Sequence, residues 1–201
     1  MDANLAILLI GDLPAHPLIT HGVVVLLPLA ALGGIVIAAM PSMRRRFGVA
    51  VLLLTIVGVG LVPLATRTGE ELESVLPPNQ PLIEAHQARG EDVLPFALAF
   101  GITVVLLLIA GRLADRERTA ASTAVTTPEG ASTAPAASGA EPDAERRATS
   151  TATIAAAPRT WRRIALVAAA LVAVSATAVT VQVVRTGHSG STAVWNGVGS
   201  P

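Results

Sequence analysis

Ile19–Met40 reads ITHGVVVLLPLAALGGIVIAAM, a stretch that has no Asp, Glu, Lys or Arg and consists almost entirely of apolar side chains. The hydrocarbon core of a bilayer is about 30 Å thick, and about 20 helical residues cross it. Lipid offers no hydrogen-bond partner to the backbone, so such a segment must be helical despite its valines and isoleucines. This stretch therefore predicts a transmembrane helix.

Three further stretches have the same character: Gly48–Thr66, Val93–Gly111 and Ile164–Val184. The composition agrees, because apolar residues make up 52% of the chain and charged residues only 14%, which is too few for the surface of a soluble domain. We therefore expect an all-α integral membrane protein in contact with the lipid bilayer. Its four transmembrane helices form a bundle, with three helices within residues 19–111 and the fourth over residues 164–184.

The remaining segments divide into an outer N-terminal segment (1–18), an outer loop (67–92), a cytoplasmic linker (112–163) and an outer C-terminal tail (185–201). The linker is rich in Ala, Thr, Ser, Pro and Glu, a composition typical of disorder. In the outer loop, Pro81 suits a first helical position and predicts a short interfacial helix over Leu82–Arg89. The apolar run Leu5–Ile10 is too short to span, and no basic segment precedes it as in a signal peptide. It is expected to lie at the interface or to pack on the bundle.

Arginine placement predicts the orientation. Nine arginines close to the helix ends lie on one side of the predicted bundle and three on the other. Basic residues near helix ends favour the cytoplasm. The protein is therefore expected to be multi-pass, with both termini outside. The nine are Arg44, Arg45, Arg46, Arg112, Arg116, Arg118, Arg159, Arg162 and Arg163, and the three are Arg67, Arg89 and Arg185.

All four histidines fall on the outer side, namely His16, His21, His86 and His188. Imidazole binds haem iron, zinc and copper and relays protons. Two histidines from different helices of a bundle commonly hold a b-type haem. The chain has no cysteine, and the histidines follow no metal-binding spacing, so the identity of a metal stays open.

The four histidines differ in local context. His16 and His21 are five residues apart, so on one helix their side chains point about 140° apart. His86 has Glu84 nearby, and Glu70 follows the second span; either carboxylate is a candidate further metal ligand. His188 lies between glycines that permit a tight turn aiming its ring back at the bundle.

Several function classes find no support. The net charge is zero, so no basic field favours nucleic acid. The spans contain no charged residue, which argues against an ion-coupled transporter or proton pump. No phosphate-binding loop or nucleophile elbow occurs. An enzyme would have only Glu70, Glu71 and the histidines to recruit, so enzymatic activity is left uncertain and is the less favoured expectation.

These residues also carry a family resemblance. The chain resembles a bacterial membrane family of domain of unknown function 2231 in His16-Pro17-Leu18, Thr68-Gly69, Glu84-Ala85-His86 and Gly187-His188-Ser189-Gly190, with Ala193-Val194-Trp195 at the end. It departs at Gly22-Val23, where the family pattern has an aromatic residue and a proline. The long linker looks like an insertion. The resemblance implies a four-helix domain in a bacterial cell membrane and no established activity.

Two functional hypotheses follow. In the first, the protein is a non-enzymatic redox or metal-binding subunit that binds haem b or a transition metal. Its ligands are His21 and His86, with His188 and His16 as further ligands or supporting groups, and its partner is a membrane redox protein. In the alternative, the protein is a structural or partner-binding membrane module without a cofactor, and its histidines cap helices and bond backbone carbonyls.

Overall fold

The structure, a computed structural model, describes residues 9–10, 13–76, 80–126 and 160–195. Four helices are long and apolar enough to cross a membrane: α2 (Ala15–Ala39), α3 (Pro41–Glu73), α5 (Val93–Thr126) and α6 (Thr160–Trp195). A short helix, α4 (Pro81–Glu91), lies between α3 and α5, and β1 (Leu9–Ile10) pairs antiparallel with β2 (Leu13–Pro14). The predicted all-α membrane fold with four spanning helices is confirmed.

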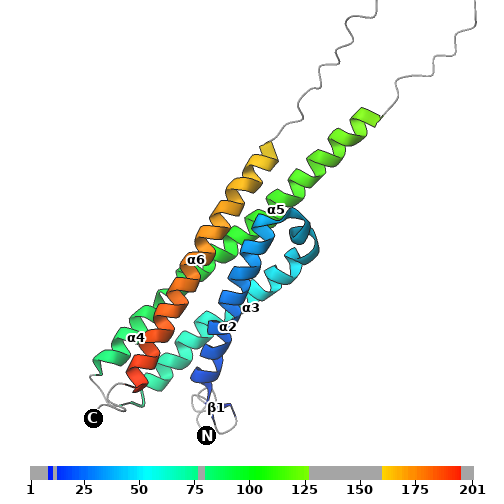
Figure 1. Ribbon diagram of the computed structural model, residues 1–201. Coiled ribbons are helices and arrows are strands. Elements are labelled where there is room, and N and C mark those ends of the chain that lie inside the picture. The colour runs from blue at the N-terminus through cyan, green and yellow to red at the C-terminus, as the bar shows by residue number, and fades with distance from the viewer. Residues whose placement is uncertain (1–8, 11–12, 77–79, 127–159, 196–201) are drawn as a thin grey trace, which may run out of the picture.

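The four long helices form a closed arrangement in which each packs on two others (Figure 1). Helix α2 contacts α3 and α6, and α5 contacts the same two helices. At one end lie the start of α2, the end of α3, all of α4 and the end of α6; we call it the histidine end. At the other end lie the α2–α3 connection, α5 from Gly111 onward and the start of α6; we call it the arginine end.

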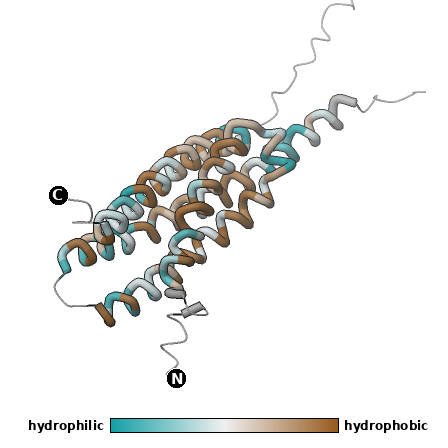
Figure 2. Tube along the Cα trace, turned by 60° about the horizontal axis from the view of Figure 1, so that its bottom comes forward, coloured by the Kyte–Doolittle hydropathy of each residue, from teal (hydrophilic) through white to brown (hydrophobic). Residues whose placement is uncertain are grey.

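The bundle has an apolar interior and an equally apolar exterior, as expected in lipid. Phe100, Leu27 and Val172 are fully buried between the helices. Large side chains also point outward, for example Leu53 and Leu166, which are 58% and 62% exposed. Figure 2 shows apolar residues along the middle of the helices and polar residues gathered at both ends. This distribution fits a hydrocarbon belt around the bundle.

Small residues and buried hydroxyls hold the helices together, because lipid gives little hydrophobic drive for helix association. A Cβ added at Gly34 of α2 would lie 3.0 Å from the Phe100 ring and 3.3 Å from Val172, so a larger residue would require these side chains to shift. Between α5 and α6, the hydroxyls of Thr103 and Ser175 are hydrogen-bonded at 2.8 Å.

The helices extend further than their apolar stretches predict. Helix α2 begins at Ala15, inside the predicted N-terminal segment, and α6 continues to Trp195, through most of the predicted C-terminal tail. Helix α5 runs to Thr126 and α6 begins at Thr160, so both ends of the predicted linker are helical. Hydropathy marks where a helix leaves the lipid, whereas its hydrogen bonding continues into polar sequence. The central linker (127–159) and residues 5–8 lie outside the described residues.

The predicted short helix over Leu82–Arg89 is present as α4, which has Pro81 at its start. Helix α4 packs mainly on α6 and also contacts α3 and α5. It runs nearly in line with α5, from which one turn residue, Asp92, separates it, and lies beside the end of α6 (Figure 1). Its position brings residues of the outer loop next to the end of the last helix.

Candidate functional site

His16 bridges the first two long helices at the histidine end. Its Nδ1 lies 3.0 Å from the backbone oxygen of Ala65 and 3.3 Å from Oγ1 of Thr68, both on α3. The imidazole is half-buried, whereas Thr68 is fully buried. The start of α2 is therefore fastened to the last turns of α3 through this ring.

His86 makes the corresponding bridge from α4 to α6. Its Nδ1 lies 3.1 Å from Oγ of Ser189, and that hydroxyl donates to the backbone oxygen of Thr186 at 2.8 Å. Ser189 is buried and the His86 ring is half-buried. The short helix is thus tied to the end of the last transmembrane helix.

The hydrogen bonds favour one tautomer of each imidazole. A carbonyl oxygen only accepts, so Nδ1 of His16 donates to Ala65. The Ser189 hydrogen is already given to Thr186, so Ser189 accepts from Nδ1 of His86. The tautomer with hydrogen on Nδ1 satisfies these contacts in both rings and presents an unshared electron pair at Nε2.

The nearest polar neighbour of Nε2 in His16 leaves that electron pair available. Thr20 Oγ1 is 3.5 Å from Nε2, but its hydroxyl donates to the backbone oxygen of His16 at 2.7 Å. Among the described residues, Nε2 of His86 has no hydrogen-bond partner. Each ring is thus held at one nitrogen and free to act as a ligand at the other.

A glycine faces each of the two rings. A Cβ at Gly69 would lie 3.0 Å from Cε1 of His16, and a Cβ at Gly190 would lie 2.9 Å from Cε1 of His86. A methyl group at either position would force the neighbouring ring to move. Gly69 therefore leaves space for the His16 ring against α3, and Gly190 leaves space for the His86 ring against α6.

Further hydrogen bonds attach α4 to its neighbours. The Gln182 amide and the Thr186 hydroxyl both donate to the backbone oxygen of Arg89, at 3.1 and 3.0 Å. On the other side, the Gln87 amide, oriented to satisfy its hydrogen bonds, donates to Oε2 of Glu73 at 2.7 Å. Helix α4 is consequently fixed from both α6 and α3, which holds His86 in place.

His16 and His86 both lie at the histidine end, where His16 contacts α3 and Gln87, next to His86, donates to Glu73 of the same helix. His21 is exposed, and its Nδ1 donates to the backbone oxygen of Pro17 within its own helix. The expected divergence of His16 and His21 is confirmed, since His16 faces α3 and His21 faces outward. His188 is also exposed and lies within α6, so the predicted turn around it is wrong.

Carboxylates contribute unequally to this end of the bundle. Glu70 and Glu84 are exposed. One turn after Thr68, Glu71 has a buried Oε2 with no hydrogen-bond partner among the described residues. Within 13–76, 80–126 and 160–195, no three His, Asp or Glu side chains form a metal-ligand group. The arrangement offers two imidazole ligands and one buried carboxylate oxygen nearby on α3.

Sequence reasoning missed the groups that hold the two rings, namely Ala65, Thr68 and Ser189. The only signal lay in short motifs: Thr68 precedes Gly69, and Ser189 precedes Gly190. In both pairs the hydroxyl hydrogen-bonds an imidazole and the glycine makes room for the same ring. Comparison with known proteins finds no matching family model, no similar curated protein and no similar solved structure.

Proposed function

We propose that the protein is a non-enzymatic membrane subunit that binds a transition-metal centre through Nε2 of His16 and Nε2 of His86. One observation carries this proposal: both rings have Nδ1 engaged by an acceptor while Nε2 keeps its electron pair. Metal-binding histidines usually donate their other ring nitrogen to such an acceptor, which fixes the ring and raises its basicity. Ala65 and Ser189 are the acceptors here.

The number of ligands favours haem iron over a bare metal ion. Structural zinc needs four protein ligands and catalytic zinc three. Haem needs only axial ligands from the protein, because the porphyrin supplies the others. His16 and His86 come from different helices of a bundle, the usual source of such ligands. When bound, haem supplies one-electron transfer, and the expected partner is a redox protein of the same membrane.

The residues at the histidine end fit this role in other respects. Gly69 and Gly190 leave one side of each ring without a covering side chain. Thr68, Ser189 and the attachments of α4 keep the two rings from turning. We place this end at the outer surface of a bacterial cell membrane, with both termini outside. The nine-to-three excess of arginines at the opposite side and the resemblance in the first motifs support that placement.

A structural or partner-binding module without a cofactor is the second candidate. It is favoured by the fact that His16 and His86 already join α2 to α3 and α4 to α6 through hydrogen bonds. In that case the two rings only join neighbouring helices, and α4 presents a fixed outer surface that binds another protein. The two candidates use the same contacts and differ in whether Nε2 binds anything.

The absorption spectrum and metal content of the purified protein separate the two candidates. Protein from haem- and metal-replete cells, extracted in mild detergent, is expected to hold about one haem or metal ion per chain. His16→Gln and His86→Gln should each lose it, while His188→Gln, which changes an exposed residue of the same end, should retain it. A substoichiometric cofactor content in the wild type would refute the metal-binding function and leave the structural module.

A further inference from the structure

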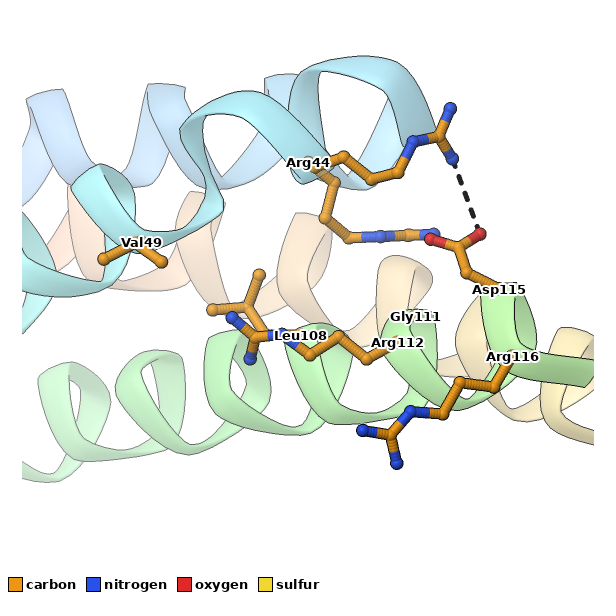
Figure 3. Close-up of a pocket in the computed structure, with 8 residues that line it drawn as sticks. Arg44, Val49, Leu108, Gly111, Arg112, Asp115 and Arg116 are labelled. Atoms are coloured by element: carbon orange, nitrogen blue, oxygen red, sulfur yellow. Dashed lines mark hydrogen bonds and ion pairs between the residues drawn. The ribbon is translucent and has the colours of Figure 1, made fainter. Parts of the chain in front are cut away.

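A basic cleft opens at the arginine end, between α3 and α5 (Figure 3). Its volume is about 280 Å³, and it is lined by four arginines: Arg44 and Arg45 from α3 and Arg112 and Arg116 from α5. Next to the cleft the two helices also approach closely, since a Cβ at Gly48 of α3 would lie 2.7 Å from Leu108 of α5. The cleft is thus formed by transmembrane helices at the edge of the apolar belt.

The positive charge of the cleft is largely uncompensated. Asp115 is its one acidic lining residue, and that carboxylate already faces Arg45 at 3.4 Å and Arg118 at 3.9 Å. Arg44, Arg112 and Arg116 have no carboxylate within 4.0 Å in the part of the chain that the structure describes. Unpaired guanidinium groups that line one cleft favour an anion, although in Figure 3 those of Arg112 and Arg116 extend in different directions.

Arg44 is held in the cleft by packing. It is half-buried and crosses α5 directly over Gly111. A Cβ at Gly111 would lie 2.8 Å from the Arg44 guanidinium carbon, so a larger residue would displace the side chain. The cleft therefore depends on the close approach of α3 to α5 at this glycine.

Apolar residues continue the cleft toward the middle of the bundle. Val49 of α3 and Leu108 of α5 line it together with the arginines. Val49 is 55% exposed, and Leu53, one turn further along α3, also faces outward. The surface thus changes from guanidinium groups to lipid-facing apolar side chains within about one helical turn.

We propose that this cleft binds the phosphate headgroup of an anionic phospholipid. Arg44, Arg112 and Arg116 donate to the phosphate oxygens, and Val49 and Leu108 contact the adjoining part of the acyl chains. Arginine donates two parallel hydrogen bonds to phosphate, and basic pockets between transmembrane helices bind anionic headgroups. A zwitterionic headgroup fits less well, because its ammonium group would face uncompensated arginines. The site lies at the opposite end from the histidines and does not depend on the proposed function.

Native mass spectrometry of the delipidated full chain tests the assignment. Dioleoyl-phosphatidylglycerol is titrated against dioleoyl-phosphatidylcholine and against inorganic phosphate at matched concentrations. We expect phosphatidylglycerol to bind tightest, and the double variant Arg112→Gln/Arg116→Gln to weaken it about 30-fold, at about 1 kcal/mol for each arginine. The control Arg162→Gln/Arg163→Gln removes the same charge from exposed positions of the same end and should leave affinity nearly unchanged.

Each other outcome overturns the proposal in a defined way. Equal affinity for inorganic phosphate means an anion site without lipid selectivity. Equal affinity for phosphatidylcholine means nonspecific lipid adsorption. Equal losses in the two double variants mean a diffuse charge effect rather than a cleft. If the glutamine variant fails to fold, Arg112→Lys/Arg116→Lys keeps the charge, removes bidentate donation, and is expected to weaken binding by several fold; unchanged affinity there contradicts the assigned geometry.

Discussion

The histidine end and the arginine end of the bundle differ in the groups that lie between their helices. At the histidine end, imidazole, amide and hydroxyl groups form hydrogen bonds between helices, and α4 packs beside the end of α6. At the arginine end, permanently charged guanidinium groups surround an open cleft and share one carboxylate. Hydrogen bonds join the helices at the histidine end, whereas a cleft lined by charged groups separates α3 from α5 at the arginine end.

The difference indicates two kinds of ligand. Imidazoles whose Nδ1 is engaged keep one electron pair each, which suits a metal centre. Guanidinium groups only donate and remain charged, which suits a phosphate. In both places a glycine permits the close contact: Gly69 and Gly190 for the rings, and Gly111 for Arg44. The comparison can therefore be tested by filling these spaces one at a time.

The largest effect is expected at Gly190. In Gly190→Ala the new methyl group would lie 2.9 Å from the His86 ring, so the ring must shift from its place beside Ser189. Changes that misplace a metal-binding histidine typically lower affinity or occupancy 10- to 100-fold. We expect a loss of about that size in cofactor content, measured by absorption and metal analysis.

Gly187→Ala, three residues earlier on α6, is the matched control. Nothing lies within 4 Å of its new Cβ, so this change should leave the cofactor unaffected and stabilise the helix by about 0.5–1 kcal/mol. Equal cofactor contents in the two variants would break the claim that Gly190 positions His86.

A somewhat smaller effect is expected from Ser189→Ala. This change removes the acceptor of the His86 Nδ1 hydrogen, so the ring keeps its place but loses its fixed orientation. We expect about tenfold lower cofactor content and a loss of about 1 kcal/mol in stability, measured by thermal unfolding in detergent. Ser191→Ala, whose hydroxyl bonds only the backbone of His188 in the described structure, is the control. A similar loss in both serine variants would contradict the role of Ser189.

At the arginine end, Gly111→Ala should act on lipid binding and spare the fold. The clash falls on the flexible side chain of Arg44, which can swing away at little energetic cost. We expect about fivefold weaker phosphatidylglycerol binding, the loss of one arginine contact, with unchanged cofactor content at the other end. Gly60→Ala on α3, which has open space around the new Cβ, serves as the control. A change in cofactor content would show that the two ends are not independent.

The smallest effect lies midway between the ends. Thr103 and Ser175 join α5 to α6 by a single hydroxyl pair. Such interhelical bonds contribute about 0.6 kcal/mol on average, because alternative partners exist within each helix. Both hydroxyls also bond backbone oxygens of their own helices, which supports a value of this size. A double-mutant cycle with alanine at both positions, followed by thermal unfolding, measures this coupling free energy. A value of several kcal/mol would mean that the strongest polar contact between helices lies in the middle of the bundle and not at its ends.

Much of the fold could be predicted from local sequence patterns, whereas the site depends on contacts between residues far apart in the sequence. Charge-free apolar stretches predict the four spans, and Pro81 predicts α4, because both signals act within a few residues. The turn predicted at Gly187–Gly190 is wrong, because helical packing against His86 outweighs the low helix propensity of glycine. The partners of His16 and His86 lie 49 and 103 positions away, so periodicity and spacing in one sequence could not identify them.

The central claim is that two imidazoles from different helices bind one metal centre. Electron–nuclear double resonance on protein labelled with ¹⁵N-histidine counts the imidazole nitrogens bound to a paramagnetic haem iron or copper ion. We predict two histidine nitrogens in the wild type and fewer in both His16→Gln and His86→Gln, with His21→Gln unchanged. A centre without bound histidine nitrogen, or one whose count is the same in all three variants, would contradict the account.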